Sequence, residues 1–241
     1  MTSPELSVVV PVHNEEANIA PLIGEIVAAL RGLIDFEIVY VDDVSRDGSA
    51  RMLIEQKRSI PELRVIRHRA QSGQSTAIRN GVKAARGLWI ATLDGDGQND
   101  PADIPKLLAA RKDADADIKL FAGWRVTRRD NFGKRISSKV ANAIRSAILK
   151  DATPDTGCGI KLFEREAFLD LPYFDHMHRY LPALMQRAGW RSVSVPVNHR
   201  HRTAGISKYN NFNRALVGIS DLRGVGWLIR RSKRSGVEEI E

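Results

Sequence analysis

The sequence is poor in cysteine, in aromatic residues and in long apolar runs. Its single cysteine, Cys158, excludes an internal disulfide and is typical of a protein from a reducing compartment. No run approaches the roughly 18 apolar residues of a membrane-spanning helix, and no basic region followed by a long apolar stretch opens the chain. We therefore expect neither a membrane span nor a signal peptide, and a protein that is soluble or peripheral.

Acidic residues are missing from one long stretch. None occurs from His176 to Ser220, where seven Lys or Arg residues lie, and the whole chain has a formal net charge of +8. Such a charge points to an anionic partner, which is a nucleic acid, an anionic membrane surface or a phosphorylated substrate. Aromatic residues make up only 6% of the chain and no nucleic-acid-binding motif is present, so a nucleic acid is the least favoured of the three.

Short apolar runs that alternate with helical patterns predict an α/β fold. Five runs have the length and composition of buried strands: Leu6–Val12, Phe36–Val41, Leu63–Arg67, Leu88–Leu93 and Ile118–Gly123. The helical patterns between them indicate right-handed βαβ units and a parallel sheet, and Pro101–Arg111 is a further expected helix. Ligands of such sheets bind beyond the carboxyl ends of the strands. We expect the polar clusters at these ends to converge: Asn14/Glu15, Asp42/Asp43 and Asp94/Asp96.

The fourth of these runs ends in two carboxylates, Asp94 and Asp96, which are separated by Gly95 and followed by Gln98. Carboxylate and amide oxygens suit a hard divalent cation, and so few protein ligands leave room for substrate phosphates. An isolated Asp-x-Asp is weak support for a metal site because many surface turns contain one. Its position at a strand end, beside the other polar clusters, is what favours a metal.

Basic residues gather in the second half of the chain. Residues 125–150 hold eight Lys or Arg and one acid, with an apolar residue about every fourth position, which predicts an amphipathic helix that lies against the core or a membrane. The segment His199–Tyr209 has the Arg, Ser, Lys and Gly of a loop that closes on a pyrophosphate, although a solvated basic loop is the simpler alternative. Asn213–Arg231 is apolar, contains Trp227 and ends in a basic cluster, which suits an anionic membrane surface, a dimer contact or a core contact equally.

Several of these segments together resemble the family 2 glycosyltransferases of the GT-A fold. Three motifs at strand ends carry the resemblance: Val8–Glu16, Val41–Ser49 and Asp94–Pro101. Three others are similar to the polyprenyl-phosphate branch, which includes dolichol-phosphate mannose synthase and undecaprenyl-phosphate sugar transferases: Gly73–Gly81, Asp155–Lys161 and Arg202–Tyr209. The resemblance implies a Rossmann-like, mostly parallel sheet flanked by helices in residues 1–210, and an amphipathic membrane-proximal helix with a basic tail in residues 211–241.

The resemblance also implies roles for individual residues. The nucleoside pocket would be lined by Pro11, His13 and Glu15, and Val41 and Asp43 would contact the base or the ribose. His13 stands where relatives often have Tyr, and Val44 stands where they usually have Gly. A Mg²⁺ or Mn²⁺ ion would be held by Asp94 and Asp96, with Gly95 between them and Gln98 completing the site. The donor and acceptor phosphates would be neutralised by Arg125, Arg202, Ser207 and Lys208.

The implied reaction is an inverting, metal-dependent transfer of a sugar from a UDP- or GDP-linked donor to a polyprenyl phosphate. The catalytic residues would be Asp96, Asp155, Arg202 and Lys208, with Asp155 as a base or as an orienter of the acceptor. A phosphate monoester is largely anionic near neutral pH, because its second pKa is about 6, so a strong base is less necessary than for a hydroxyl acceptor. We expect the protein at the cytoplasmic face of a membrane, as a peripheral protein, with an integral membrane partner or a second copy as a further possible partner.

Three other functions compete with this one. A family 2 enzyme that acts on a glycan hydroxyl commonly places a Glu-Asp or Asp-Asp pair after the fifth strand, and Asp155-Thr-Gly-Cys158 does not offer that pair. A basic nucleic-acid-binding module lacks a motif, and its carboxylate clusters would repel phosphate without a metal. An inactive binding protein on the same scaffold is disfavoured because all the expected metal-site residues are present.

Overall fold

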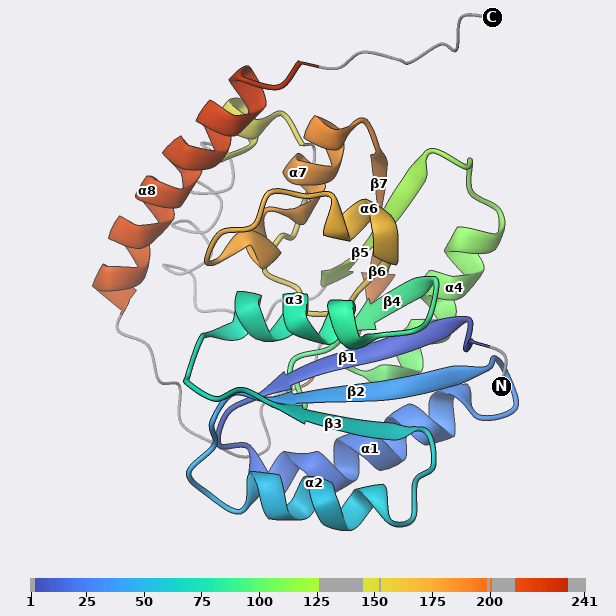
Figure 1. Ribbon diagram of the computed structural model, residues 1–241. Coiled ribbons are helices and arrows are strands. Elements are labelled where there is room, and N and C mark those ends of the chain that lie inside the picture. The colour runs from blue at the N-terminus through green and yellow to red at the C-terminus, as the bar shows by residue number, and fades with distance from the viewer. Residues whose placement is uncertain (1–2, 126–144, 152, 199, 201–210, 234–241) are drawn as a thin grey trace, which may run out of the picture.

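The computed structural model describes residues 3–125, 145–151, 153–198, 200 and 211–233. Its centre is one seven-stranded sheet with the order β3-β2-β1-β4-β6-β5-β7 (Figure 1). The strands are β1 (Leu6–Val12), β2 (Phe36–Asp42), β3 (Leu63–Arg67), β4 (Trp89–Thr92), β5 (Ile118–Arg125), β6 (Lys161–Glu164) and β7 (Arg191–Val197). Among these strands only β6 runs antiparallel to both of its neighbours. The expected mostly parallel α/β sheet is therefore confirmed.

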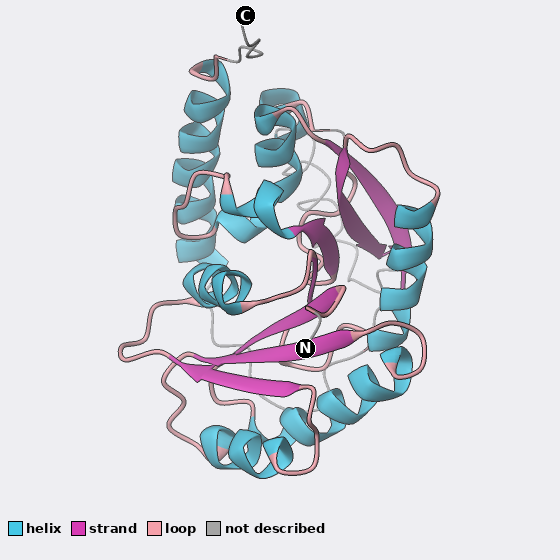
Figure 2. Ribbon diagram, turned by 45° about the vertical axis from the view of Figure 1, so that its right-hand side comes forward, coloured by secondary structure: helices cyan, strands magenta, loops and turns pink. Residues whose placement is uncertain are grey.

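Helices cover both faces of the sheet. They are α1 (Glu16–Leu30), α2 (Ser49–Lys57), α3 (Gln74–Ala84), the short turn η1 (Pro101–Asp103), α4 (Ile104–Lys112), α6 (Arg165–Leu169), the short turn η2 (Met177–Arg179), α7 (Leu181–Ala188) and α8 (Asn211–Arg230). In Figures 1 and 2, α1 and α2 lie below the sheet and α3 lies on its other face, while α8 runs along the outside of α7.

The alternation of side chains along the strands builds two separate cores. Val8 and Val10 of β1 pack with the apolar side of α1 and with Leu107 of α4. Val9, between them, points to the other face and packs with α3, α6 and α7. All seven residues of β1 are buried, as are all seven of β2. A strand that is buried on both faces needs a mostly apolar run, which is the pattern in the sequence. The buried polar residues Ser7 and Glu37 satisfy each other, because the Ser7 hydroxyl donates to the Glu37 carboxylate at 2.7 Å.

The C-terminal helix contributes to the second of these cores. Val225 of α8 is buried there, and the Arg187 Nε of α7 donates to the Leu228 carbonyl at 3.1 Å. None of the described helices combines the length and the apolar character that crossing a bilayer requires. The division into a domain of residues 1–210 and an extension of residues 211–241 stays a prediction.

Several elements differ from the sequence prediction. The fourth strand is shorter than Leu88–Leu93, and Leu88 is exposed. The helix expected at Pro101–Arg111 opens as a three-residue 3-10 turn, where the Asp100 carboxylate accepts from the Ala102 N–H. Strand β7 and helices α6 and α7 were not predicted. Strand β7 contains serines and a proline, and α6 and α7, with five and eight residues, are too short to show a helical period. The amphipathic helix expected in residues 125–150 falls mostly outside the described residues, of which 145–149 are helical.

Candidate active site

The polar clusters lie together at one edge of the sheet, the edge at which the parallel strands end. Asp43 follows β2, Asp94 follows β4 by two residues, and Arg125 ends β5. Because β6 runs the other way, it starts at this edge, with Lys161 paired to Thr92. The loop that precedes β6 therefore also lies at this edge, with Asp155, Cys158 and Gly159. The convergence predicted from the strand ends is what the topology produces.

Asp43 organises the loop between β3 and α3. Its Oδ1 accepts from the Ser72 N–H and lies 2.7 Å from the His68 Nδ1, and its Oδ2 accepts from the Gly73 N–H at 2.8 Å. Burial raises the pKa of Asp43, but the hydrogen bonds from His68 and from the two amides outweigh it, so the net shift is downward. Asp43 is thus an ionised anchor of the loop, whether or not it also contacts a nucleotide.

His13 is held in one tautomer. Its Nδ1 lies 2.8 Å from the carbonyl oxygen of Asp43, and a carbonyl only accepts, so Nδ1 carries the proton. Its Nε2 is then the acceptor, 3.3 Å from the Asn14 amide nitrogen. The imidazole therefore lies at the junction of the first and second strand ends, where the sequence predicted a nucleoside-binding residue.

The other residues predicted for the nucleoside pocket surround this junction. Pro11 and Val41 are register partners in β1 and β2, and both are buried. The Glu15 carboxylate accepts from the Asn18 amide at 2.7 Å. Val44 has φ +60°, the left-handed conformation that explains why a glycine would be usual there. The valine keeps the turn at the cost of strain.

The two carboxylates after β4 are held by close packing of backbone. A Cβ on Gly95 would lie 2.6 Å from a Val12 methyl and 2.8 Å from the Pro11 carbonyl, so only glycine lets the loop approach the end of β1. The Asp96 carboxylate accepts from the Gln98 N–H at 3.1 Å. Gln98 is tied through its main chain, since its carbonyl also accepts from the Arg200 N–H. A metal contact of its side chain stays a prediction.

The electrostatics of Asp94 favour a cation. Burial and then the neighbouring charge of Asp96 raise the pKa of Asp94, which means that these surroundings destabilise its ionised form. A divalent ion between the two carboxylates would remove that destabilisation. Among the described residues, no group of three or more His, Cys, Asp and Glu side chains could hold a metal alone. Two carboxylates with substrate phosphates fit Mg²⁺ or Mn²⁺, which keep several non-protein ligands.

Arg125 and Asp155 form a two-point ion pair beside these carboxylates. The Nε of Arg125 donates to Oδ2 at 2.6 Å and its Nη2 to Oδ1 at 2.8 Å. Burial alone would lower the pKa of Arg125, but the pairing with Asp155 raises it. Only 12% of the Arg125 side chain and 6% of the Asp155 side chain are exposed. Asp155 therefore orients Arg125 in this structure. Its role as a base or as an orienter of the acceptor stays a prediction.

Lys161 is a residue of this edge that the sequence did not single out. Its side chain is buried and its ammonium donates to the Cys158 carbonyl. Burial lowers the pKa of Lys161, while the thiol of Cys158 and the Asp94 carboxylate oppose that shift. The sequence signal that could have pointed to Lys161 is its position inside the apolar run Ile160–Phe163, because a charged residue in such a run is unusual. Its bond ties the first residue of β6 to the loop that precedes this strand.

Arg202, Ser207 and Lys208, which were also predicted for the site, lie outside the described residues.

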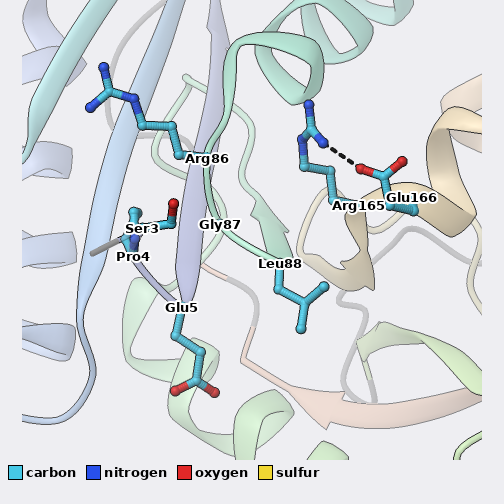
Figure 3. A pocket seen from close by; sticks show the side chains of 8 residues that line it. All are labelled: Ser3, Pro4, Glu5, Arg86, Gly87, Leu88, Arg165 and Glu166. Atoms are coloured by element: carbon cyan, nitrogen blue, oxygen red, sulfur yellow. Dashed lines mark hydrogen bonds and ion pairs between the residues drawn. The ribbon is translucent and has the colours of Figure 1, made fainter. Parts of the chain in front are cut away.

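A cavity of about 450 Å³ lies at the opposite edge of the sheet, before β1 and β4 and after β6 (Figure 3). It is lined by Ser3, Pro4, Glu5, Arg86, Gly87, Leu88, Arg165 and Glu166. Because ligands of parallel sheets bind at the carboxyl ends of the strands, this cavity is not the candidate active site.

Comparisons with known proteins show what the chain is similar to. The chain is 34% identical to the dodecaprenyl-phosphate galacturonate synthase of Rhizobium johnstonii, over 96% of this chain and 69% of that protein. The glucosyl-3-phosphoglycerate synthase of Mycobacterium tuberculosis, solved with Mn²⁺ and UDP, superposes with a TM-score of 0.70 at 20% identity, over 97% and 82% of the two chains. A mannosyltransferase from Pyrobaculum calidifontis, solved with GDP-mannose and Mn²⁺, gives 0.65 at 19%, over 98% and 67%.

These two structures share the GT-A fold with the chain. The model of the family described as Glycosyl transferase family 2 matches residues 7–171, which include β1 to β6 and both carboxylates of the Asp-x-Asp motif. The match confirms the resemblance drawn from the motifs at the strand ends. The chain belongs to glycosyl transferase family 2 and is a glycosyltransferase.

Proposed function

We propose that the protein transfers a sugar from a nucleotide-diphosphate sugar to a polyprenyl phosphate, with inversion at the anomeric carbon. The observation that carries the proposal is the meeting of Asp43, the Asp94/Asp96 pair and the Arg125–Asp155 pair at one edge of the sheet. The relative that is 34% identical over nearly the whole chain is by name a dodecaprenyl-phosphate galacturonate synthase, which makes UDP-galacturonate the first donor to test.

Each residue has a part in the charge balance of the reaction. As an acceptor oxygen attacks the anomeric carbon, negative charge develops on the departing nucleotide diphosphate. A divalent ion held by Asp94 and Asp96 would supply electrostatic stabilisation of that charge. Arg125, fixed by Asp155, holds a positive charge at the same edge. With Arg125, a set of three further residues is proposed to neutralise the donor and acceptor phosphates: Arg202, Ser207 and Lys208. Pro11, His13 and Glu15 are proposed to line the nucleoside pocket, and Val41 and Asp43 to contact the base or the ribose.

A panel of nucleotide sugars tests this function. The purified protein is incubated with Mn²⁺, a short polyprenyl phosphate and, in turn, UDP-galacturonate, UDP-glucose and GDP-mannose, and lipid extracts are analysed by mass spectrometry. We expect a glycosylated lipid phosphate with one donor and none after chelation of the metal. Transfer to a glycan hydroxyl but to no lipid phosphate would replace this function by the hydroxyl-acceptor alternative.

The role of Asp155 gives a prediction for stability. Replacing Asp155 by alanine leaves the buried Arg125 guanidinium without its partner, so the free energy of unfolding should fall by about 3 kcal/mol. Urea unfolding followed by circular dichroism measures it. In the R125A/D155A double variant the loss should be smaller than the sum of the two single losses, since both break one interaction.

The variant Asp155→Asn separates an orienting role from a base. Asparagine still accepts a hydrogen bond from Arg125, so an orienting role predicts more activity in D155N than in D155A. A base would be lost equally in both variants. If D155N is folded but as inactive as D155A, the result would therefore support a base role for Asp155.

We propose that α8 holds the protein at a membrane surface, at the cytoplasmic face. Three large apolar side chains of α8 are exposed, Val217 by 39%, Ile219 by 51% and Trp227 by 53%. The Arg231 guanidinium lies 5.9 Å from the centre of the Trp227 ring. An exposed tryptophan beside arginines suits the interface of an anionic bilayer. An integral membrane partner or a second copy of the chain stays a prediction.

Binding to vesicles tests the role of α8. Trp227→Ala should weaken sedimentation with anionic liposomes by about tenfold, since burial of a large apolar side chain contributes roughly 1.5–3 kcal/mol. Leu33→Ala is the matched control, because Leu33 is 59% exposed but lies after α1, away from α8. If W227A bound the vesicles as tightly as the wild type, α8 would not be the membrane contact. The same conclusion would follow if the wild-type protein did not bind the vesicles at low salt.

A further inference from the structure

The first turn of α3 touches both halves of the candidate active site. Gly73, just before the helix, has φ +83° and donates its N–H to the Asp43 carboxylate at 2.8 Å. Gln74, the first helical residue, extends its side chain to the other half and donates from Nε2 to the Asp94 Oδ1 at 2.7 Å. Two consecutive residues thus join the end of β2 to the end of β4.

The remaining contacts of Asp94 restrict its carboxylate from the other side. Gly159 packs so closely that a Cβ there would lie 2.1 Å from the Asp94 Oδ2. The Asp94 N–H donates to the Asn99 Oδ1 at 2.8 Å, which holds the main chain. Packing against Gly159 limits where the carboxylate can lie, but it supplies no hydrogen bond. The amide of Gln74 supplies a directional one, and so selects one orientation of the two oxygens.

The turn that carries Gln74 is itself anchored from behind. Ser75 is buried, and its Oγ lies 2.7 Å from the His178 Nδ1 in η2. Burial, and then the positive charges of Lys161 and Arg179, lower the pKa of His178 well below its usual value, so the ring is neutral. Next to it, the Thr76 hydroxyl lies 2.6 Å from the Tyr173 hydroxyl. The segment from Tyr173 to His178 therefore fixes the position of the first turn of α3.

We propose that Gln74 is a positioning residue for the metal carboxylate Asp94, and that the Ser75–His178 hydrogen bond holds Gln74 in place. Metal-bound carboxylates generally need hydrogen-bond partners of their own, and loss of such a partner typically costs about 10- to 100-fold in metal affinity or activity. This inference rests on the proposed function, because it assumes that Asp94 and Asp96 bind a divalent ion together with a nucleotide diphosphate.

Direct measurement of metal binding tests the proposal without the reaction. Mn²⁺ is titrated into the full-length protein with saturating UDP, and free Mn²⁺ is followed by electron paramagnetic resonance. Gln74→Leu keeps the size of the side chain but removes the amide, and should weaken Mn²⁺ binding by about tenfold. Ser75→Ala removes only the anchor, and should weaken it by a smaller factor, about two- to fivefold.

Matched variants separate positioning from folding. Gln74 is exposed, so Q74L should melt at the wild-type temperature. Gln56→Leu makes the same change on α2, where the amide contacts only the Met52 sulfur at 4.0 Å among the interactions of the described residues, and Mn²⁺ binding should be unchanged. Gln74→Asn keeps an amide one methylene too short, and should also bind Mn²⁺ weakly, which excludes the apolar character of leucine as the cause.

Two outcomes would overturn the inference, and they are distinguishable. If the wild type binds Mn²⁺ with UDP and Q74L binds it equally tightly, Gln74 does not position Asp94 and the proposed function stands. If the wild type itself binds no Mn²⁺ with UDP, the metal assignment fails and the inference fails with it. Weaker binding in Q74L and Q74N, with unchanged melting temperatures and an unaffected Q56L, supports the positioning role.

Discussion

Replacing Asp96 by alanine should abolish sugar transfer, with a fall in kcat/KM of about three orders of magnitude. Asp96 is one of two carboxylates that follow β4, and its charge, after burial, is the second cause that raises the pKa of Asp94. Without Asp96 the divalent ion loses half of its carboxylate ligands, and the departing diphosphate loses its main stabilisation. Initial rates at saturating Mn²⁺ with the active donor measure the effect.

The control for this variant is the replacement of an aspartate that lies away from the candidate active site. Asp113 is exposed and ends α4, so D113A removes an equal charge without touching the sheet edge. D113A should have wild-type activity, and both variants should keep the wild-type circular dichroism spectrum. Activity of D96A near that of the wild type would remove Asp96 from the metal site.

The second large effect is expected from Gly159→Ala. The added Cβ would lie 2.1 Å from the Asp94 Oδ2 and 2.5 Å from the Asn99 Oδ1, both of which are side-chain atoms that can move. The fold should therefore survive with a loss of about 1–3 kcal/mol, while the Asp94 carboxylate is pushed from its position. A displacement of about 1 Å in an active site can cost 100-fold in rate, and we expect a loss of that size in kcat.

Gly157 provides the matched substitution two residues away in the same loop. A Cβ there would lie 3.2 Å from the Arg125 Nη2 and 3.7 Å from the Asp155 Oδ1, a tight contact that a small shift relieves. G157A should therefore lose much less activity than G159A. If the two variants lost activity equally, the effect would come from the stiffness of the loop and not from the contact with Asp94.

Much of the fold was predictable because local patterns express it. The buried runs of β1 and β2 read as strands because both faces of these strands are covered. The edge strand β7 was missed, since two serines and a proline interrupt its valines. The antiparallel β6 is only four residues long, and no local pattern states its direction.

The candidate site was predictable where a residue follows a strand in the sequence. Asp43, Asp94 and Arg125 all do so, and the parallel topology then brings them to one edge. Gln74, His178 and Lys161 escaped notice because their relevance depends on neighbours far away in the chain. Gln74 lies 20 residues from Asp94, and Ser75 lies 103 residues from His178.

By itself the sequence determined the fold class, the family and the two carboxylates of the expected metal site. The fold class follows from the alternation of strand and helix patterns, and the family and the carboxylates follow from short motifs at strand ends. The tertiary structure alone decided how those carboxylates are held and what Asp155 contacts. Hydrogen bonds such as those from Gln74 to Asp94 and from Arg125 to Asp155 depend on distance and direction in space. Such contacts form only when the sheet has brought the strand ends together, and no spacing along the chain encodes them.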